Sequence, residues 1–247
     1  MSSAAELRKR GTRRAVILAG GRGTRLRPYT VVLPKPLMPI GEFPILEVIV
    51  RQLARAGFDR VTMAVNHQAE LIKAFFGDGG KWGMRIDYSL EDRPLGTMGP
   101  LRLIADLPEH FLVMNGDVLT DLDFAALFKA HVASEAIFTI SSSRREEVID
   151  YGVLETDGNG RLIGFREKPR SYYEVSMGVY ILSARVLHYI PPDRLYGFDH
   201  LMLDLVAAGE RVAVRRFDGY WLDIGRPDDY ARAIDEFDAM RGRFLNG

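Results

Sequence analysis

Three glycines and three arginines are gathered in one short segment that directly follows the apolar run Ala15–Ala19. The segment reads Gly20-Gly21-Arg22-Gly23-Thr24-Arg25-Leu26-Arg27. Glycine lets a backbone approach a ligand closely and turn its N–H groups toward phosphate oxygens, while arginine adds fork-shaped donors that suit phosphate. The pattern predicts a loop that holds a phosphate-bearing ligand. A surface turn with solvated arginines would have the same composition and stays open as the alternative.

This loop differs from the two commonest phosphate-binding motifs. A Walker loop has Lys-Ser or Lys-Thr after its last glycine, whereas Thr24-Arg25 follows here. The dinucleotide fingerprint has a third glycine where this chain has Leu26. Kinases with a Walker loop and Rossmann dehydrogenases are therefore disfavoured.

A single lysine stands between two prolines in Leu33-Pro34-Lys35-Pro36. Proline fixes its own φ and biases the residue before it toward an extended conformation, so this loop should be stiff. A stiff loop that presents one ammonium suits a site where negative charge must be stabilised during a reaction. The alternative is a proline-rich connection with an exposed lysine.

Two aspartates follow apolar runs in distant parts of the chain: Asp117 after Phe111–Asn115, and Asp223 in Trp221-Leu222-Asp223-Ile224-Gly225. Either one alone is commonly a helix cap or a turn residue. If folding brings them together, their oxygens suit magnesium, which binds carboxylates and phosphates. Spacing along the chain leaves this pairing a hypothesis about the fold.

Short apolar runs alternate with helical periodicity through the first half, which indicates βαβ units and a parallel sheet. The second half is richer in strands, and the turn 157–160 predicts a hairpin. We expect a single α/β domain that is Rossmann-like, with a mixed, mainly parallel central sheet and helices on both faces. Ligands of such sheets bind at the carboxyl ends of the strands. The expected strands are 14–19, 60–65, 84–89, 111–115, 135–141, 152–155, 161–166, 175–182 and 212–217, and the expected helices are 44–57, 69–76, 97–105, 122–132, 198–208 and 227–237.

Composition excludes several classes of protein. Thirty-three basic residues balance thirty-three acidic ones, so no global positive field favours nucleic-acid binding. The chain has no cysteine, which excludes disulfides and fits a reducing cytoplasm. Its apolar runs are too short to cross a membrane, and the opening segment lacks the apolar stretch of a signal peptide. We expect a flexible extension over residues 1–13 and one domain over 14–247.

Taken in this order, the motifs resemble the sugar-1-phosphate nucleotidyltransferases, also called sugar-nucleotide pyrophosphorylases. The resemblance runs from Ala15 to about Phe237 and includes Glu167-Lys168-Pro169 and Tyr151-Gly152-Val153. It implies an enzyme that condenses a sugar 1-phosphate with a nucleoside triphosphate and releases pyrophosphate. Relatives with a second activity or allosteric control carry a C-terminal β-helix. This chain stops at Gly247 without room for one, so a single-activity enzyme with no C-terminal β-helix is expected.

The resemblance also assigns roles to residues. Arg25 would contact the β- and γ-phosphates, Lys35 the phosphates during transfer, and Asp117 with Asp223 would ligate Mg²⁺; Arg25, Lys35 and Asp117 are the expected catalytic residues. The family's Asn-Ala-Gly segment reads Ser176-Met177-Gly178 here, which weakens the transfer of a sugar contact to Ser176. The expected nucleotide-binding residues are Ala19, Gly20, Gly21, Arg22, Gly23, Thr24, Arg25, Glu91, Gly96 and Thr97, and the expected sugar-phosphate-binding residues are Asn115, Gly152, Glu167, Lys168 and Ser176.

The segment Leu90–Gly99 resembles the part of the family that reads the base. Uridylyl- and thymidylyl-transferring relatives often have glutamine where this chain has Glu91. A carboxylate only accepts hydrogen bonds, so it complements the adjacent N1–H and N2–H₂ donors of guanine. We therefore expect GTP with mannose 1-phosphate or a manno-heptose 1-phosphate. The alternatives are UTP or dTTP with N-acetylmuramic acid 1-phosphate or glucose 1-phosphate, and a non-catalytic regulatory paralogue that binds nucleotide sugars.

The partners expected from the resemblance are the nucleoside triphosphate and the sugar 1-phosphate. Neither nucleic acid nor a membrane is expected as a partner. Relatives often form homodimers or homotetramers, so one of these assemblies is expected as well.

Overall fold

The computed structural model describes residues 13–21, 23–66 and 68–245. The predicted extension over residues 1–13 lies outside the described residues except for Arg13, whose guanidinium donates to the Ala56 carbonyl at 3.2 Å. Arg22, one of the expected nucleotide-binding residues, also lies outside them. In this part of the chain, no helix has the length and apolar character that crossing a membrane requires.

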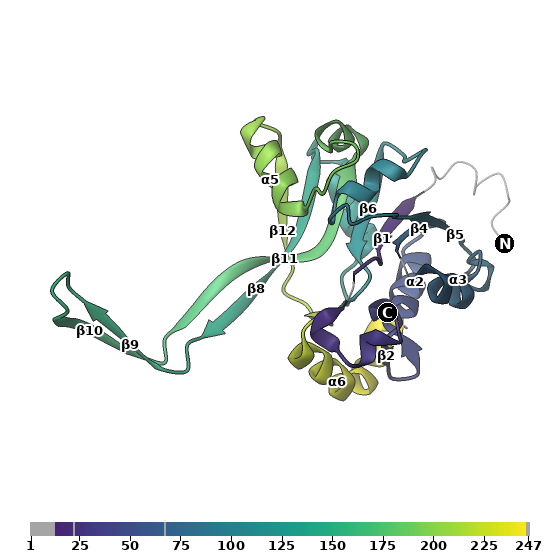
Figure 1. Ribbon diagram of the computed structural model, residues 1–247. Helices are drawn as coiled ribbons and strands as arrows, with labels where there is room; N and C mark the ends of the chain where they lie inside the picture. The colour runs from purple at the N-terminus through teal and green to yellow at the C-terminus, as the bar shows by residue number, and fades with distance from the viewer. Residues whose placement is uncertain (1–12, 22, 67, 246–247) are drawn as a thin grey trace.

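A seven-stranded sheet forms the centre of the molecule, in the order β12-β8-β11-β6-β1-β4-β5 (Figure 1). The parallel half consists of β1 (Arg14–Leu18), β4 (Arg60–Val65), β5 (Arg85–Leu90) and β6 (His110–Asn115). Then β11 (Arg170–Ser183) pairs antiparallel with both β6 and β8 (Phe138–Val148), and β12 (Val212–Arg216) runs parallel to β8. The sheet is mixed and mainly parallel, as predicted.

Helices cover both faces of this sheet, and side-chain alternation explains why. Ala15 and Ile17 of β1 point into one core with α2 (Ile45–Arg55), α3 (Ala69–Phe76), α4 (Phe124–Val132) and α6 (Pro227–Leu245). Val16 points into a second core with η5 (Gly99–Leu103), η6 (Ala184–Tyr189) and α5 (Phe198–Ala207). A strand buried on both faces is a continuous apolar run rather than an alternating one, which is why β1 was recognisable in the sequence.

Most of the predicted elements are present, with two differences near the site. The helix expected over 97–105 is a short 3₁₀ helix, η5, which begins with Gly99-Pro100, a pair poorly suited to the interior of an α-helix. A small antiparallel sheet of β7 (Val118–Thr120) and β13 (Trp221–Asp223) was not predicted. The remaining short elements are η1 (Thr24–Leu26), η2 (Tyr29–Val31), η3 (Lys35–Leu37), β2 (Pro39–Ile40), β3 (Phe43–Pro44) and η4 (Gly80–Trp82).

Strands β8 and β11 are much longer than predicted and continue past the sheet as a two-stranded ribbon (Figure 1). The ribbon carries the hairpin of β9 (Gly152–Thr156) and β10 (Leu162–Glu167) at its far end. The hairpin turn lies at 157–160 as predicted, with Gly160 at φ 80°. We call residues 142–176 the arm, and it projects well away from the rest of the molecule.

Candidate active site

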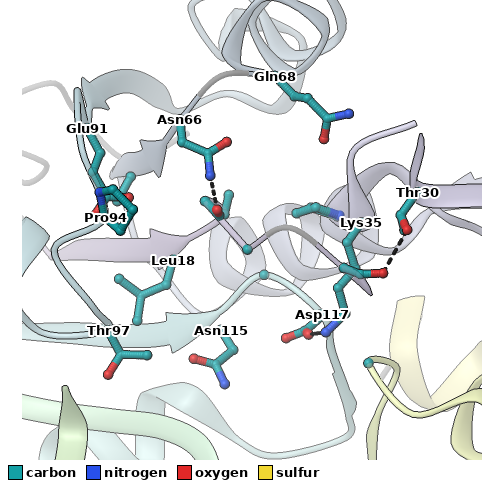
Figure 2. Close-up of a pocket in the computed structure, with 18 of the residues that line it drawn as sticks. Leu18, Thr30, Lys35, Asn66, Gln68, Glu91, Pro94, Thr97, Asn115 and Asp117 are labelled. Atoms are coloured by element: carbon teal, nitrogen blue, oxygen red, sulfur yellow. Dashed lines mark hydrogen bonds and ion pairs between the residues drawn. The ribbon is translucent and has the colours of Figure 1, made fainter. Parts of the chain in front are cut away.

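A cavity of about 950 Å³ opens at the carboxyl ends of the parallel strands (Figure 2). The glycine–arginine loop follows β1, Glu91 follows β5, and Asn115 ends β6, so neighbouring strands deliver these residues to one edge of the sheet. Lys35 and Asp117 line the same cavity. Every expected nucleotide-binding residue that the structure describes also lines it: Ala19, Gly20, Gly21, Gly23, Thr24, Arg25, Glu91, Gly96 and Thr97.

Neighbouring segments hold the glycine-rich loop in place. The Thr30 hydroxyl donates to the Gly23 carbonyl at 2.7 Å, and the Asn66 amide donates to the Gly20 carbonyl (Figure 2). Gly23 has φ 58°, and a Cβ there would lie 2.8 Å from the Thr30 methyl carbon, so both conformation and space require glycine. At Gly21, by contrast, a Cβ would meet nothing within 4 Å. The backbone at Gly21 therefore faces open space that a ligand could occupy.

Asp117 and Asp223 lie next to each other, which is the arrangement that the sequence left as a hypothesis. Asp223 of β13 stands opposite Val118 of β7, the residue after Asp117. The backbone N–H of Ile224 donates to the Asp117 carbonyl at 3.0 Å. The Asp223 carboxylate accepts from the Gly225 N–H at 2.9 Å, which helps to fix its orientation. The small β7–β13 sheet is thus the element that brings the two carboxylates together.

Lys35 reaches the same place from η3. Its ammonium forms an ion pair with the Asp117 carboxylate (Figure 2), and these two side chains are only 12% and 14% exposed. Burial lowers the pKa of Lys35 from its usual 10.5, while nearby Asp223 raises it and Arg25 lowers it. Lys35, Asp117, Asp223 and Arg25 therefore form one electrostatically connected group at the edge of the cavity.

The donors in this group fit magnesium. The described residues contain no set of three His, Cys, Asp or Glu side chains that could hold a metal by themselves. Magnesium does not need such a cage, because it is commonly bound by one or two carboxylates together with water and substrate phosphates. Asp117 and Asp223 supply two hard carboxylate donors beside a cavity large enough for a phosphate-bearing ligand.

Glu91 lies on the opposite wall of the large cavity from Lys35 (Figure 2). One of its carboxylate oxygens accepts from the Leu95 N–H at 2.8 Å. Burial raises the pKa of Glu91 from its usual 4.5, and the Leu95 N–H lowers it in part. A Cβ on Gly20 would lie 3.1 Å from the other carboxylate oxygen, so the loop packs closely against this side chain. Glu91 is fixed in position with one oxygen facing the loop.

A second cavity of about 300 Å³ shares Asn115 with the first. Ser176 and Asp223 line it, as do two arginines, Arg145 and Arg226. The indole N–H of Trp221 donates to the Met177 carbonyl at 3.0 Å and fixes one wall. A small polar cavity with two guanidinium groups suits an anionic ligand.

Three expected sugar-phosphate residues are not brought to this cavity. Gly152, Glu167 and Lys168 lie partway along the arm, where the β9–β10 hairpin begins, and line neither cavity. The Lys168 ammonium instead pairs with the Asp150 carboxylate at 2.7 Å. The physical reason is the β8–β11 ladder, which is continuous from Ser142–Ser176 to Val148–Arg170 and carries the hairpin outward. Of the five residues expected in this group, Asn115 and Ser176 line the smaller cavity, while Gly152 and Glu167 pair with each other on the hairpin.

The structure adds cavity residues that the sequence did not single out. Asn66 directly follows β4 and lines the large cavity. The rule that ligands collect just past strand ends would have found it. Arg145 and Arg226 come from β8 and from the turn before α6, where arginine is ordinarily a solvated surface residue. Nothing in their sequence context separated them from the other arginines.

Comparison with known proteins places the chain in a family. It is 37% identical over 241 residues to the UTP–glucose-1-phosphate uridylyltransferase of Synechocystis sp. (90% of this chain, 62% of the relative). It is 36% identical over 225 residues to the mannose-1-phosphate guanyltransferase of Yarrowia lipolytica (88% and 62%). The chain thus spans less than two thirds of the length of these two relatives.

Solved structures and a family model agree with these relatives. The crystal structure of HddC from Yersinia pseudotuberculosis is 28% identical, with a TM-score of 0.70 over 92% of this chain and 100% of HddC. HddC complexed with GMP-PN matches equally well, at 27% identity and a TM-score of 0.70 over the same shares of both chains. The model of the nucleotidyl transferase family matches residues 14–239, nearly the whole described chain. This chain is therefore a member of the nucleotidyl transferase family.

Proposed function

We propose that this protein condenses a sugar 1-phosphate with a nucleoside triphosphate, giving a nucleotide sugar and pyrophosphate, with GTP and mannose 1-phosphate or a manno-heptose 1-phosphate as substrates. The observation that carries the proposal is the junction of the two cavities. Asn115 lines both, Asp117 lines the larger, and neighbouring Asp223 lines the smaller. Two substrates bound in the two cavities would have their phosphates meet beside these carboxylates.

The larger cavity suits the nucleotide. Its volume of about 950 Å³ lies at the upper end of the range of small-molecule sites. The glycine-rich loop would hold the triphosphate through backbone N–H groups, and Arg25 would neutralise part of its charge. Glu91 lies on the opposite side of the cavity and would contact the base. The sugar 1-phosphate would take the smaller cavity, beside Ser176 and Arg226.

The chemistry requires no activated side chain. A sugar phosphate has a second pKa of roughly 6, so its dianion is already a nucleophile near neutral pH. One of its oxygens would attack the α-phosphorus, a new P–O bond would form, and the bond from that phosphorus to the bridging oxygen would break with pyrophosphate as the leaving group. The site must align two anions and stabilise the charge between them. Lys35 and Arg25 are the cations positioned to do so.

Asp117 and Asp223 would hold magnesium, whose charge would stabilise the phosphate oxygens when it is bound. Magnesium held by two carboxylates would also bind substrate phosphate and water. Lys35, whose ammonium pairs with Asp117, would stabilise the negative charge of the transferring phosphate.

The choice of guanine rests on Glu91. HddC has been crystallised with GMP-PN and the Yarrowia relative is named a guanyltransferase, but the Synechocystis relative is named a uridylyltransferase at similar identity. Similarity alone therefore leaves UTP or dTTP, with N-acetylmuramic acid 1-phosphate or glucose 1-phosphate, as the alternative. A non-catalytic regulatory paralogue is the second alternative, and the joint presence of Lys35, Asp117 and Asp223 argues against it.

A pyrophosphate-release assay tests the proposal directly. Four nucleoside triphosphates are crossed with mannose, manno-heptose, glucose and N-acetylmuramic acid 1-phosphates, with and without Mg²⁺. Magnesium-dependent release is expected with GTP and a manno-configured sugar. Release with UTP or dTTP instead would overturn the assignment of Glu91, and no release from any pair would overturn catalysis. A cytoplasmic location belongs to the same proposal, since the cysteine-free composition fits a reducing compartment.

A further inference from the structure

The residues expected to hold the sugar phosphate are divided between two distant parts of the molecule. Asn115 and Ser176 line the smaller cavity, while Glu167 and Lys168 lie partway along the arm, past the outer end of the β8–β11 ladder and where the β9–β10 hairpin begins (Figure 1). The Lys168 side chain is 57% exposed, and its ion pair with Asp150 at 2.7 Å lies at the surface, where such a pair contributes little stability. The smaller cavity of a single chain thus lacks Glu167 and Lys168, which are expected to bind the sugar phosphate.

Lys168 lies too far along the arm to reach the cavity at the base of the same arm. The β8–β11 ladder of the arm holds seven consecutive residue pairs, from Ser142–Ser176 at the base to Val148–Arg170 at its outer end. At a rise of roughly 3.3 Å per residue, this ladder is about 20 Å long. Lys168 lies beyond its outer end, whereas Ser176 at its inner end lines the smaller cavity.

Side-chain contacts stabilise the arm in this extended form. Glu146 accepts from the Arg170 guanidinium at 3.0 Å and from the Tyr172 hydroxyl at 2.8 Å across the ladder. The Arg144 guanidinium lies 4.1 Å from the centre of the Tyr172 ring, a cation–π contact. Bringing Glu167 and Lys168 back to the cavity of their own chain would require the ladder to bend sharply and lose these contacts.

The outer arm also exposes far more apolar surface than a solvated ribbon normally does. A two-stranded ribbon is marginally stable in water, and clustered exposed apolar side chains mark a contact surface. In the described structure β9 and β10 pair only with each other. Nine large apolar side chains of the arm are at least 45% exposed: Val148, Ile149, Tyr151, Leu154, Leu162, Ile163, Phe165, Tyr172 and Tyr173.

We infer that a second copy of this chain covers the arm, and that each arm delivers Glu167 and Lys168 to the smaller cavity of the other copy. The base of the arm forms part of that cavity through Arg145, Val175 and Ser176. Two identical arms that lie antiparallel across a two-fold axis can place the outer end of each β8–β11 ladder, with Glu167 and Lys168, against the base of the other, where the cavity opens. The inference rests on the proposed function, since it names the residues that complete the sugar-phosphate site.

Charge supports this arrangement. Arg226 is an exposed guanidinium at the smaller cavity, and the arriving Glu167 carboxylate can pair with it. The cations that line the smaller cavity of one chain are the Arg145 and Arg226 guanidinium groups. Lys168 of the other copy would add an ammonium there for the sugar phosphate. The exchange would therefore add Glu167 and Lys168 to a cavity that holds two of its five expected sugar-phosphate-binding residues.

A mixed-subunit experiment separates exchange from a site within one chain. Lys168→Ala and Asp117→Asn variants carry different affinity tags, are co-expressed, and the doubly tagged dimer is purified. Each variant alone should lose at least tenfold in activity. In the mixed dimer one site combines an intact body with an intact arm, so about half of the wild-type activity should return. Activity no higher than that of the two variants alone would overturn the inference, as would a monomer of 27.8 kDa for the wild type in sedimentation.

A matched pair calibrates this experiment. Lys129 is an exposed lysine on α4, outside both cavities. A mixed dimer of Lys129→Ala with Asp117→Asn should show the same half activity, whichever chain completes the site. The ratio of the activities of the two mixed dimers thus shows whether the intact arm of the Asp117→Asn chain replaces the missing Lys168 of the other chain.

Cross-linking tests the exchange without any assay of activity. The chain has no cysteine, so Lys168→Cys with Arg226→Cys introduces the only two thiols of each chain, and exchanged arms would join them as two symmetry-related disulfides between the chains. Exchanged arms should give covalent dimers of twice 27.8 kDa on oxidation. Only monomers on a non-reducing gel would overturn the inference. Covalent dimers of the double-cysteine variant, together with no pyrophosphate release by the wild-type protein, would instead overturn the proposed function and keep the exchange.

Discussion

The backbone N–H of Ile224 donates to the carbonyl of Asp117 at 3.0 Å, and this contact aligns two aspartates that are more than a hundred residues apart in the chain. Because β7 and β13 pair in register, Asp223 stands opposite the residue that follows Asp117. The contact depends on the backbone, so substituting either carboxylate should leave the strand pairing in place. The carboxylates can therefore be tested separately from the fold that presents them.

Replacing Asp117 or Asp223 with asparagine should lower kcat by about 100-fold or more, the scale of losing one electrostatic group at a reacting phosphate. The double variant should lose little more than the worse single variant, because residues that act as a unit are not additive. Steady-state kinetics with a Mg²⁺ titration measures both effects. Asp218→Asn, at an exposed aspartate paired with Arg216, is the control and should keep wild-type rates. Strictly additive losses would argue against a shared metal.

Gly225 offers a way to disturb Lys35 without changing any charged residue. A Cβ at this position would collide with the Lys35 ammonium and lie 2.9 Å from the Asp223 carboxylate. Gly225→Ala should therefore displace Lys35 and lower kcat at least tenfold, with a smaller effect on nucleotide affinity. The control is Gly242→Ala, because a Cβ there meets nothing within 4 Å. Wild-type kinetics for Gly225→Ala would show that the position of Lys35 does not limit the reaction.

Local sequence patterns were sufficient for much of the fold and for one side of the site. The ranges of β4 and α3 were predicted as they occur, because a buried strand and a short amphipathic helix each depend on local apolar spacing. The glycine–arginine loop was predicted from its composition directly after a strand, and Glu91, Gly96 and Thr97 were expected from the family resemblance. The rule that ligands collect just past strand ends reaches Asn66, which was not singled out.

What could not be predicted depends on pairing between distant segments. The meeting of β7 with β13 joins Asp117 to Asp223 but leaves no mark in the spacing of either segment. The extension of β8 and β11 into the arm could not be predicted from the sequence. Its residues, such as Arg144 and Glu146, are exposed, so no apolar face marks them as part of a strand. Its ladder is set by cross-strand contacts, and these also decide where Lys168 lies.

A buried histidine pair should make folding stability depend on pH. His131 is 1% exposed, its Nε2 lies 3.1 Å from Nδ1 of His110, and its other nitrogen contacts the Thr139 hydroxyl at 2.7 Å. Burial, together with the charge of His110, lowers the pKa of His131 from 6.5 to about 4. The unfolded chain therefore binds a proton that the folded chain rejects between these values. The contribution of His131 to the free energy of unfolding is fully present above pH 6.5. It should fall by about 2–3 kcal/mol as the pH drops toward 4.

Urea unfolding at pH 7.5 and pH 5 measures this effect. His131→Gln should be less stable than the wild type at pH 7.5 but should lose less free energy of unfolding on acidification. His188→Gln, at an exposed histidine on η6, is the control and should keep the wild-type difference. Equal pH dependence in His131→Gln and the wild type would assign the acid sensitivity to other groups.

Glu91 should make the preference for guanine depend on pH. Burial raises the pKa of this carboxyl above its usual 4.5. As the pH falls through that raised value, the carboxylate gains a proton and can donate, so it no longer complements two adjacent guanine donors. The ratio of GTP affinity to UTP affinity should therefore fall from pH 7 toward pH 5, and this ratio cancels the titration of the triphosphate common to both nucleotides. Isothermal titration calorimetry with both nucleotides gives the ratio at each pH.

The Glu91→Gln variant completes this test, because glutamine keeps the shape of the side chain but offers both a donor and an acceptor at every pH. Its affinity for GTP should drop about tenfold, in line with one lost charge-assisted hydrogen bond of roughly 1.5 kcal/mol or more. Its GTP-to-UTP ratio should stay flat between pH 7 and pH 5. Asp92→Asn, at the exposed neighbouring residue on the cavity rim, should behave like the wild type. If Glu91→Gln keeps both the wild-type ratio and its pH dependence, another group reads the base.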